Sequence, residues 1–480
     1  MNRLRLLFLP AAWLMVLAAC KPGELLDNRP PDTRLFVDSI RLSGESRLNS
    51  VVRLHWLGED PDGYVRGYEW SADGSDWFYT VRTDSTFRFE LPAGSDTADF
   101  RFFVRAIDNL GLADPEPARL TVPVKNEPPF ARFDTINALP DTVLPVLTAL
   151  WTAGDLDGGE TLDSLFIRLN GGPWYALSAQ TRLITLIAAS PQQAGSQQAR
   201  ILAGAEAREL PRRLDGLQVD GVNRLYVRAR DIAGAFSPAD STGAFFMRRQ
   251  RGDLLVIDAH GEAAPDSLYR NILNARYPNY DWYNLRAQLP GLWDPTFRLL
   301  LAQYDKVFWY GDDVLLTSLN NQLLLEAAAG PLQRYLNGGG KLLITAKFPP
   351  LSAWAAGNGS AVFGFSPMDS VSSSTGQARM PTGSRALPAG LFAGGDTLAA
   401  SSFITGADPF YAKDPGGVIY TGELTPVGGW QGPAAIAALG RFTNGSPNQV
   451  FFSIELHRLS QRRQSLERML DRILNQEFNW

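Results

Sequence analysis

The hydrophobic positions of the chain follow two different patterns before and after about residue 250. In the first part, short runs alternate apolar and polar residues; Phe100, Phe102 and Val104 share one face, and Arg101, Phe103 and Arg105 share the other. A period of two predicts strands in half-buried sheets. The many turn signals between these runs, such as Asp73-Gly74, predict antiparallel sheets packed as sandwiches.

After residue 251 the apolar runs become continuous. Residues 254–257, 307–310 and, after Lys341, 342–344 are of this kind, as is typical of parallel strands buried on both faces. Later strands are predicted at 418–421, 434–439 and 450–454. Helices are predicted near 265–273, at 320–336 and at 460–475, so strands and helices alternate. This order predicts an open, mostly parallel α/β sheet.

An internal repeat divides the first part into two. Each copy has a tryptophan, an Asp-x-Asp-Gly turn and a Val-Arg-Ala-x-Asp strand, at Trp56, 60–63 and 104–108 and then at Trp151, 155–158 and 227–231. We therefore predict β-sandwiches at 33–125 and 126–250. The second copy is longer, and we expect its insertion, near 178–211, to be a long loop or a short helix.

These motifs resemble fibronectin type III and related immunoglobulin-like domains of bacterial surface proteins. The resemblance covers residues 33 to 248, and Asn126-Glu127-Pro128-Pro129 resembles a linker between the copies.

The second part, from 251 to 480, resembles the class I glutamine amidotransferase-like fold, which implies a three-layer, flavodoxin-like α/β domain. The resemblance is carried by 253–258, by 304–309 and by 335–344 with its Gly338-Gly339-Gly340 turn. Active members of that family place a cysteine directly after this third strand. Here the turn reads Thr345-Ala346-Lys347-Phe348-Pro349, with neither cysteine nor serine, and the resemblance therefore implies a pseudoenzyme. The family's closing His-x-Glu pair is also absent in that order.

The N-terminus predicts export. Arg3 and Arg5 precede an apolar run from 6 to 17, followed by Leu17-Ala18-Ala19-Cys20. This is the pattern of a signal peptide, and its end resembles the bacterial lipobox, which implies a lipid on Cys20. We expect a signal peptide at 1–19, a tether at 20–32, and attachment to a membrane through the lipid. Lys21 favours the outer membrane of a Gram-negative cell envelope.

Composition excludes some partners. The chain is 45% hydrophobic and carries a formal charge of −5, so it has no basic field for nucleic acid. Cys20 is the sole cysteine, so no internal disulfide forms.

Acidic turns are candidate calcium sites. Asp60 and Asp62 in one copy, and Asp155 and Asp157 in the other, offer carboxylate oxygens. Aspartate and glycine also serve turn geometry alone, since aspartate bonds its own backbone. Two or three carboxylates fall short of the six to eight oxygens that calcium takes. We therefore expect no cofactor, with calcium as the alternative.

A second group of polar residues follows the C-terminal strands. In open α/β sheets, ligands bind beyond the carboxyl ends of the strands. The residues predicted at this edge, which we call the rim, are Asp258, His260, Asp312, Asp313, Lys347, Glu455 and His457. The long segment 352–415, rich in glycine, serine and alanine, is predicted to be a lid over the rim or an irregular insertion. His55 is interpreted as structural.

Three functions remain open. The first is a non-catalytic lipoprotein in which sandwiches space an α/β domain from the membrane, where it binds an envelope protein or a glycan. The second is an envelope hydrolase using His260 or His457 with Asp258 or Glu455, with or without a metal; it requires these groups to converge. The third is glycan capture by exposed, coplanar aromatic rings among Trp70, Trp77, Trp174 and Trp430.

Overall fold

A computed structural model describes residues 27–37, 42–43, 47–92, 94–319, 321–348, 359–372, 376–442 and 445–478. The predicted signal peptide, Cys20 and the first part of the predicted tether lie outside these residues. Within the described ranges, no helix has both the length and the apolar content needed to cross a bilayer. The chain divides into two compact units: Met1–Pro129 with Asp155–Asp163 and Arg230–Phe236, and the remainder.

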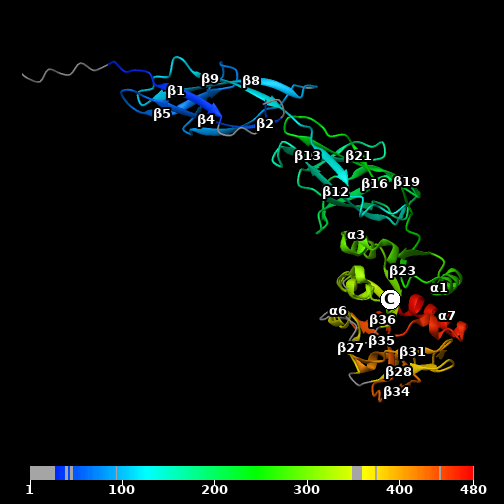
Figure 1. The fold of residues 1–480 in the computed structure, drawn as a ribbon. Helices are drawn as coiled ribbons and strands as arrows, with labels where there is room; N and C mark the ends of the chain where they lie inside the picture. Colours follow the sequence, from blue (N-terminus) through cyan, green and yellow to red (C-terminus); the bar gives the residue numbers. More distant parts are fainter. Residues whose placement is uncertain are drawn as a thin grey trace, which may run out of the picture. The chain divides into compact units, whose positions relative to one another are not determined.

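The first unit contains two sheets that share one core. The smaller sheet has the order β1 (Asp32–Val37), β4 (Val51–Glu59), β7 (Asp84–Arg88), and the larger has β2 (Leu42–Ser43), β3 (Arg47–Leu48), β9 (Ala118–Lys125), β8 (Thr97–Asp108), β5 (Val65–Ser71), β6 (Phe78–Thr80) (Figure 1). Trp56 on β4 is buried in the same cluster as Phe102 and Val104 on β8. The predicted period of two is therefore confirmed, and the first repeat forms a β-sandwich.

The second repeat is also built of packed sheets. One sheet follows the order β10 (Phe130–Phe133), β12 (Val146–Gly154), β15 (Leu183–Ala188), β16 (Gly195–Ala203), with β17 (Arg208–Glu209) and β18 (Leu214–Val219) both on β16. A second sheet has the order β14 (Tyr175–Ser178), β13 (Leu162–Leu169), β20 (Leu225–Asp231), β21 (Asp240–Ser241). A third sheet has the order β11 (Thr142–Val143), β22 (Phe245–Met247), β19 (Gly221–Asn223).

The expectation of a loop or short helix near 178–211 is wrong. This segment forms β15, β16 and β17, and β15 pairs with β16 along five residues of each strand. Its apolar residues are buried, including Ile184, Leu186 and Ile201. Gln192, Gln193 and Gln198 of this segment are exposed, whereas Ala188 and Ala199 are buried with the other apolar residues of the hairpin.

The C-terminal sheet has nine strands and two halves. The parallel half has the order β24 (Tyr280–Asn284), β23 (Leu254–Ala259), β25 (Lys306–Gly311), β26 (Lys341–Ala346), β36 (Pro447–Phe452). The antiparallel half continues from β36 with β35 (Ala435–Arg441), β33 (Val418–Gly422), β29 (Arg385–Pro388), β30 (Leu398–Ala399). Three predicted strands, at 254–258, 307–310 and 341–345, are confirmed, whereas the edge strand β24 was not predicted. The expectation of a mostly parallel sheet is wrong for the half from β35 to β30, in which every pairing is antiparallel.

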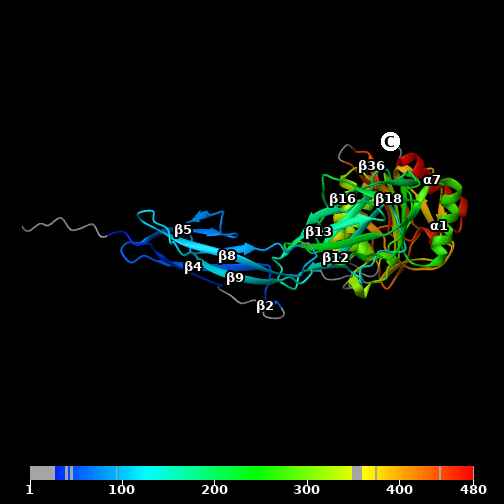
Figure 2. The ribbon, with the colours of Figure 1, turned by 90° about the horizontal axis from the view of Figure 1, so that it is seen from above.

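Helices pack on both faces of the parallel half. On one face, α1 (Ala263–Arg276) and α7 (Arg463–Arg472) share a buried cluster with Val256 and Phe308; both views show the two helices side by side (Figures 1 and 2). On the other face, α3 (Pro295–Leu301) and α5 (Ala329–Asn337) pack on Ile257 and Trp309.

Two predicted helices differ from their expected form. The helix expected at 320–336 is split into α4 (Leu324–Ala327) and α5, and the closing helix becomes a π-helix at η7 (Ile473–Glu477). Segment 352–415, in its described part, is not an irregular loop. The remaining elements are α2 (Pro290–Trp293), α6 (Gly359–Phe365), β27 (Met368–Val371), β28 (Gln377–Met380), β31 (Ile404–Ala407), β32 (Phe410–Ala412), β34 (Thr425–Val427), and the short turns η1 (Arg286–Gln288), η2 (Thr317–Leu319), η4 (Gly390–Phe392), η5 (Pro415–Gly417) and η6 (Leu456–Leu459).

Candidate functional site

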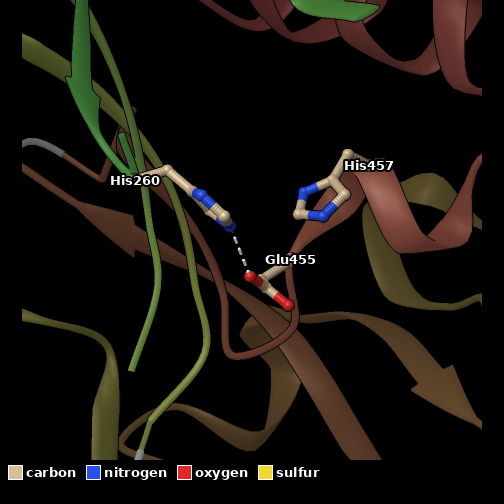
Figure 3. A group of neighbouring side chains, drawn as sticks. All are labelled: His260, Glu455 and His457. Atoms are coloured by element: carbon tan, nitrogen blue, oxygen red, sulfur yellow. Dashed lines mark hydrogen bonds and ion pairs between the residues drawn. The ribbon is translucent and has the colours of Figure 1, made fainter. Parts of the chain in front are cut away.

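Three of the predicted rim residues converge. The Nε2 atom of His260 lies 2.9 Å from Oε1 of Glu455, and the rings of His260 and His457 are 5.3 Å apart, edge to face. Figure 3 shows the three side chains pointing toward one another, His260 from the segment after β23 and the other two from the segment after β36. One ligand-type atom from each residue lies within 4.8 Å of the others. We call these residues the His–Glu–His group.

Hydrogen bonds from neighbouring elements fix the backbone of this group. Oδ1 of Asp258 accepts the N–H groups of His260 and Gly261, both at 3.0 Å. The N–H of His457 donates to the hydroxyl of Tyr269 on α1, at 3.0 Å. Next to it, the N–H of Leu456 donates to Oγ1 of Thr345 on β26, at 2.8 Å. The side chains are therefore placed by rigid elements, as a preorganised site requires.

The group is largely removed from water. His260 and Glu455 are 4% and 3% exposed, and His457 is half-buried. An ionised carboxylate only accepts hydrogen bonds, so the hydrogen between the first two residues belongs to Nε2 of His260. The other ring nitrogen, Nδ1, is buried and has no hydrogen-bond partner among the described residues. The second oxygen of Glu455 lies against the guanidinium of Arg458.

Burial and charge shift the three titrations in different directions. Burial lowers the pKa of His260, but the hydrogen bond to Glu455 and the charges of Glu455 and Asp312 outweigh it, and the pKa is raised. Burial raises the pKa of the Glu455 carboxyl, but the bond from His260 and the charges of His457 and Arg458 outweigh it, and the pKa is lowered. Burial lowers the pKa of His457 to about 4. At neutral pH the group holds one carboxylate and one neutral imidazole, which suits proton transfer or cation binding.

The other rim carboxylates are engaged elsewhere. Both oxygens of Asp312 accept from Nη2 of Arg286, at 2.6 and 2.7 Å, and Oδ2 of Asp313 accepts from Nζ of Lys347 at 2.6 Å. Asp408, which was not among the predicted rim residues, accepts the N–H of Phe348 at 3.3 Å. No pattern in the sequence links these two residues to the strand ends, because Arg286 lies in the short turn η1 and Asp408 lies between β31 and β32.

The bend after β26 carries no activated nucleophile in its described part, 345–348. The one hydroxyl there belongs to Thr345, and it donates to the carbonyl of Ile454 at 2.7 Å while accepting the N–H of Leu456. Its role is to join β26 to the segment after β36.

Two of the four candidate calcium ligands, Asp62 and Asp157, help to hold the segment that precedes each sandwich. Each copy repeats the same two contacts, from an asparagine amide and from the next backbone N–H. In the first copy, the side-chain amide of Asn28 donates to Asp108 at 2.6 Å, and the N–H of Arg29 donates to Asp62 at 3.0 Å. In the second copy, the side-chain amide of Asn126 donates to Asp231 at 2.7 Å, and the N–H of Glu127 donates to Asp157 at 2.8 Å. Within their own turns, Oδ1 of Asp60 accepts the N–H of Asp62 at 3.4 Å, and Oδ1 of Asp155 that of Asp157 at 3.1 Å.

The four tryptophans proposed for glycan capture are all half-buried. The guanidinium of Arg105 lies over Trp77, and those of Arg168 and Arg228 lie over Trp174. Trp70 stacks between phenylalanines, and Trp430 packs against a buried cluster. These rings do not form the exposed coplanar pair that the third hypothesis requires. The remaining histidine, His55, stacks on Phe36 in the first sandwich.

No protein-family model matches the chain, and no curated protein does. Solved structures that it resembles include the fibronectin(III)-like modules of CbhA from Clostridium thermocellum, at 14% identity over 45% of this chain and 94% of that chain, with a TM-score of 0.19. The PKD1 domain of the Vibrio cholerae metalloprotease PrtV matches at 14% identity over 20% and 100%, with a TM-score of 0.16. A Bacteroides ovatus mixed-linkage glucan protein, SGBP-B, matches at 10% identity over 49% and 52%, with a TM-score of 0.14. At such TM-scores these likenesses carry no argument about function.

Proposed function

We propose that this chain is a lipid-anchored cell-envelope protein that binds an envelope protein or a glycan at the rim of its C-terminal sheet. The observation that carries the proposal is the convergence of His260, Glu455 and His457. Polar side chains buried together at the carboxyl ends of parallel strands occupy the place where α/β sheets bind their ligands. In this proposal the two sandwiches act as spacers between the membrane and the rim.

The C-terminal domain is proposed to be flavodoxin-like and a non-catalytic relative of amidotransferase-like domains. The strand order β24-β23-β25-β26-β36 supports this, because it corresponds to the order 2-1-3-4-5 of flavodoxin-like sheets. The absence of cysteine from 345–348 supports a binding rather than an acyl-transfer role.

Capture from envelope extracts tests the binding role. The purified chain is incubated with solubilised envelope proteins and, separately, with an array of envelope glycans. Capture of a specific protein or glycan that is lost in His260→Ala and His457→Ala, and retained in the matched control His55→Ala, is expected. Equal capture by all four proteins would place binding away from the rim and refute the proposal.

The anchor has its own test. Cys20→Ser is expected to move the protein from the membrane fraction to the soluble fraction and to abolish labelling with radioactive palmitate. A Cys20→Ser protein that stays in the outer-membrane fraction would contradict the lipid anchor.

An envelope hydrolase is the second candidate, favoured by the hydrogen bond between His260 and Glu455. A carboxylate that orients an imidazole is a common arrangement for a general base, which adds about 10²–10⁴-fold to a rate. Turnover of chromogenic esters or of peptidoglycan fragments that falls by this factor in His260→Ala would support it. Turnover equal to that of buffer would remove it.

A further inference from the structure

We propose that the His–Glu–His group is a binding site for one divalent transition-metal ion of the zinc type. Two imidazoles and one carboxylate are a donor set that such ions take, and three protein ligands leave a position open for water or a ligand atom. The inference concerns the same rim as the proposed binding function, but it stands on the geometry of these side chains alone.

The distances between the candidate ligand atoms are close to those of a metal site, and small side-chain rotations would bring the atoms into position. Metal–ligand bonds of about 2.0–2.2 Å in a tetrahedral site place the ligand atoms about 3.3–3.6 Å apart. In the structure, Nε2 of His260 and Oε1 of Glu455 are 2.9 Å apart, and no pair in the set exceeds 4.8 Å. No movement of a strand or helix is needed to bring the atoms to bonding positions.

The surroundings supply the support that metal ligands need. Arg458 lies against Oε2 of Glu455, the oxygen that is not bonded to His260, and fixes the carboxylate as outer partners of metal ligands do. The hydroxyl of Tyr269 and Oγ1 of Thr345 hold the backbone of His457 and of its neighbour. His457 is half-buried whereas the other two side chains are buried, so an ion reaches the group from the side of His457.

Metal titration of the full chain tests the inference. The protein is purified in detergent with an affinity tag that lacks histidine, stripped with a chelator, and titrated with Zn²⁺ by calorimetry; Co²⁺ is added separately for its visible absorption. One Zn²⁺ per chain is expected. His260→Ala, His457→Ala and Glu455→Gln are each expected to weaken binding at least about tenfold. The matched control His55→Ala is expected to bind as the wild type does.

Some outcomes would overturn the inference. They are a wild type that takes up no Zn²⁺, ligand variants that bind as tightly as the wild type, or a site that prefers Ca²⁺ to Zn²⁺. Should an alanine variant fail to fold by circular dichroism, His457→Gln replaces it. A rise in the wild-type melting temperature with Zn²⁺, reversed by chelator, gives a measurement that needs no variant; the absence of that rise counts against the site.

The two proposals fail separately. Partner or glycan capture that survives chelation and disappears in His457→Ala would leave the binding function and remove the metal. Binding of one Zn²⁺ per chain without any specific capture would support the metal site and refute the proposed binding function.

Discussion

Replacement of Asp408 by asparagine is expected to stabilise the second unit at high pH and to leave it unchanged at low pH. Burial is the largest cause that raises the pKa of this carboxyl, from 3.8 to about 7. The N–H of Phe348 and the charge of Lys347 lower the pKa in part, but Lys347 already pairs with Asp313, whose charge raises the pKa again. Ionised Asp408 is therefore poorly compensated in the folded protein.

The sign and size follow from linkage. A carboxyl whose pKa is raised on folding contributes stability below about pH 4, and this stability is lost as the pH rises through about 7. One pKa unit corresponds to 1.36 kcal/mol, so a shift of about three units corresponds to about 4 kcal/mol. Because the side chain keeps part of its surface at solvent, we expect about 2–4 kcal/mol. Asparagine still accepts the N–H of Phe348 and does not ionise.

Urea unfolding at pH 4.5 and pH 8, followed by tryptophan fluorescence, measures the effect. Asp408→Asn is expected to be more stable than the wild type by about 2–4 kcal/mol at pH 8 and by little at pH 4.5. Other groups titrate equally in both proteins, so the difference between them isolates this residue. A difference that is the same at both pH values, or a variant less stable at pH 8, would refute the reasoning.

Three further changes and one matched control test the packing of the second unit by the same unfolding assay. Asp281→Ala is expected to cost about 3 kcal/mol, because the carboxylate is 0% exposed and accepts from a tyrosine hydroxyl and a backbone N–H; a loss below 1 kcal/mol would contradict this. Trp309→Ala is expected to cost about 3–5 kcal/mol, since the indole is fully buried between the sheet and its helices. Gly390→Ala is expected to cost about 2 kcal/mol or more, because its φ is +51° and a Cβ would lie 2.4 Å from the carbonyl of Val418. The matched change Gly330→Ala, in open space on α5, is expected to stabilise by about 0.5–1 kcal/mol.

Much of the fold could be predicted from the sequence because its signals are local. Continuous apolar runs such as 254–257 are typical of strands in a sheet covered on both faces, and β23, β25 and β26 are found where these runs lie. The rule that parallel strands end at one edge also brought His260 and Glu455 to the same place, although 195 positions separate them.

The parts that were not predicted depend on tertiary contacts. β24 reads Tyr-Asp-Trp-Tyr-Asn, and it is a strand because Asp281 is buried against partners from other elements. The glutamines, alanines and arginines around the hairpin of β15 and β16 favoured a loop, although β15 itself reads Leu-Ile-Thr-Leu-Ile-Ala, a run typical of a buried strand. The contacts of Arg168 on β13 and Arg228 on β20 with Trp174, which directly precedes β14, depend on a strand pairing that is not readable from spacing.

The repeated role of the Asn-x-Pro-Pro segments is visible in the sequence once the two are compared. Asn28-Arg29-Pro30-Pro31 and Asn126-Glu127-Pro128-Pro129 share one pattern, and each asparagine binds the aspartate that ends a Val-Arg-Ala-x-Asp strand. Taken singly, the second segment resembles a linker and the first belongs to the predicted tether. The pattern that they share instead indicates that both dock on the repeat that follows.

The position of β36 has a consequence for biosynthesis. Of the nine strands in its sheet, β36 is translated last, yet it lies between the parallel and the antiparallel halves and pairs with both. Until residues 447–452 have left the ribosome, the two halves have no shared partner, and β26 and β35 each present an open edge. A nascent chain is therefore expected to be vulnerable to aggregation throughout the synthesis of residues 347–446, and the rim acquires Glu455 and His457 only when the sheet is joined.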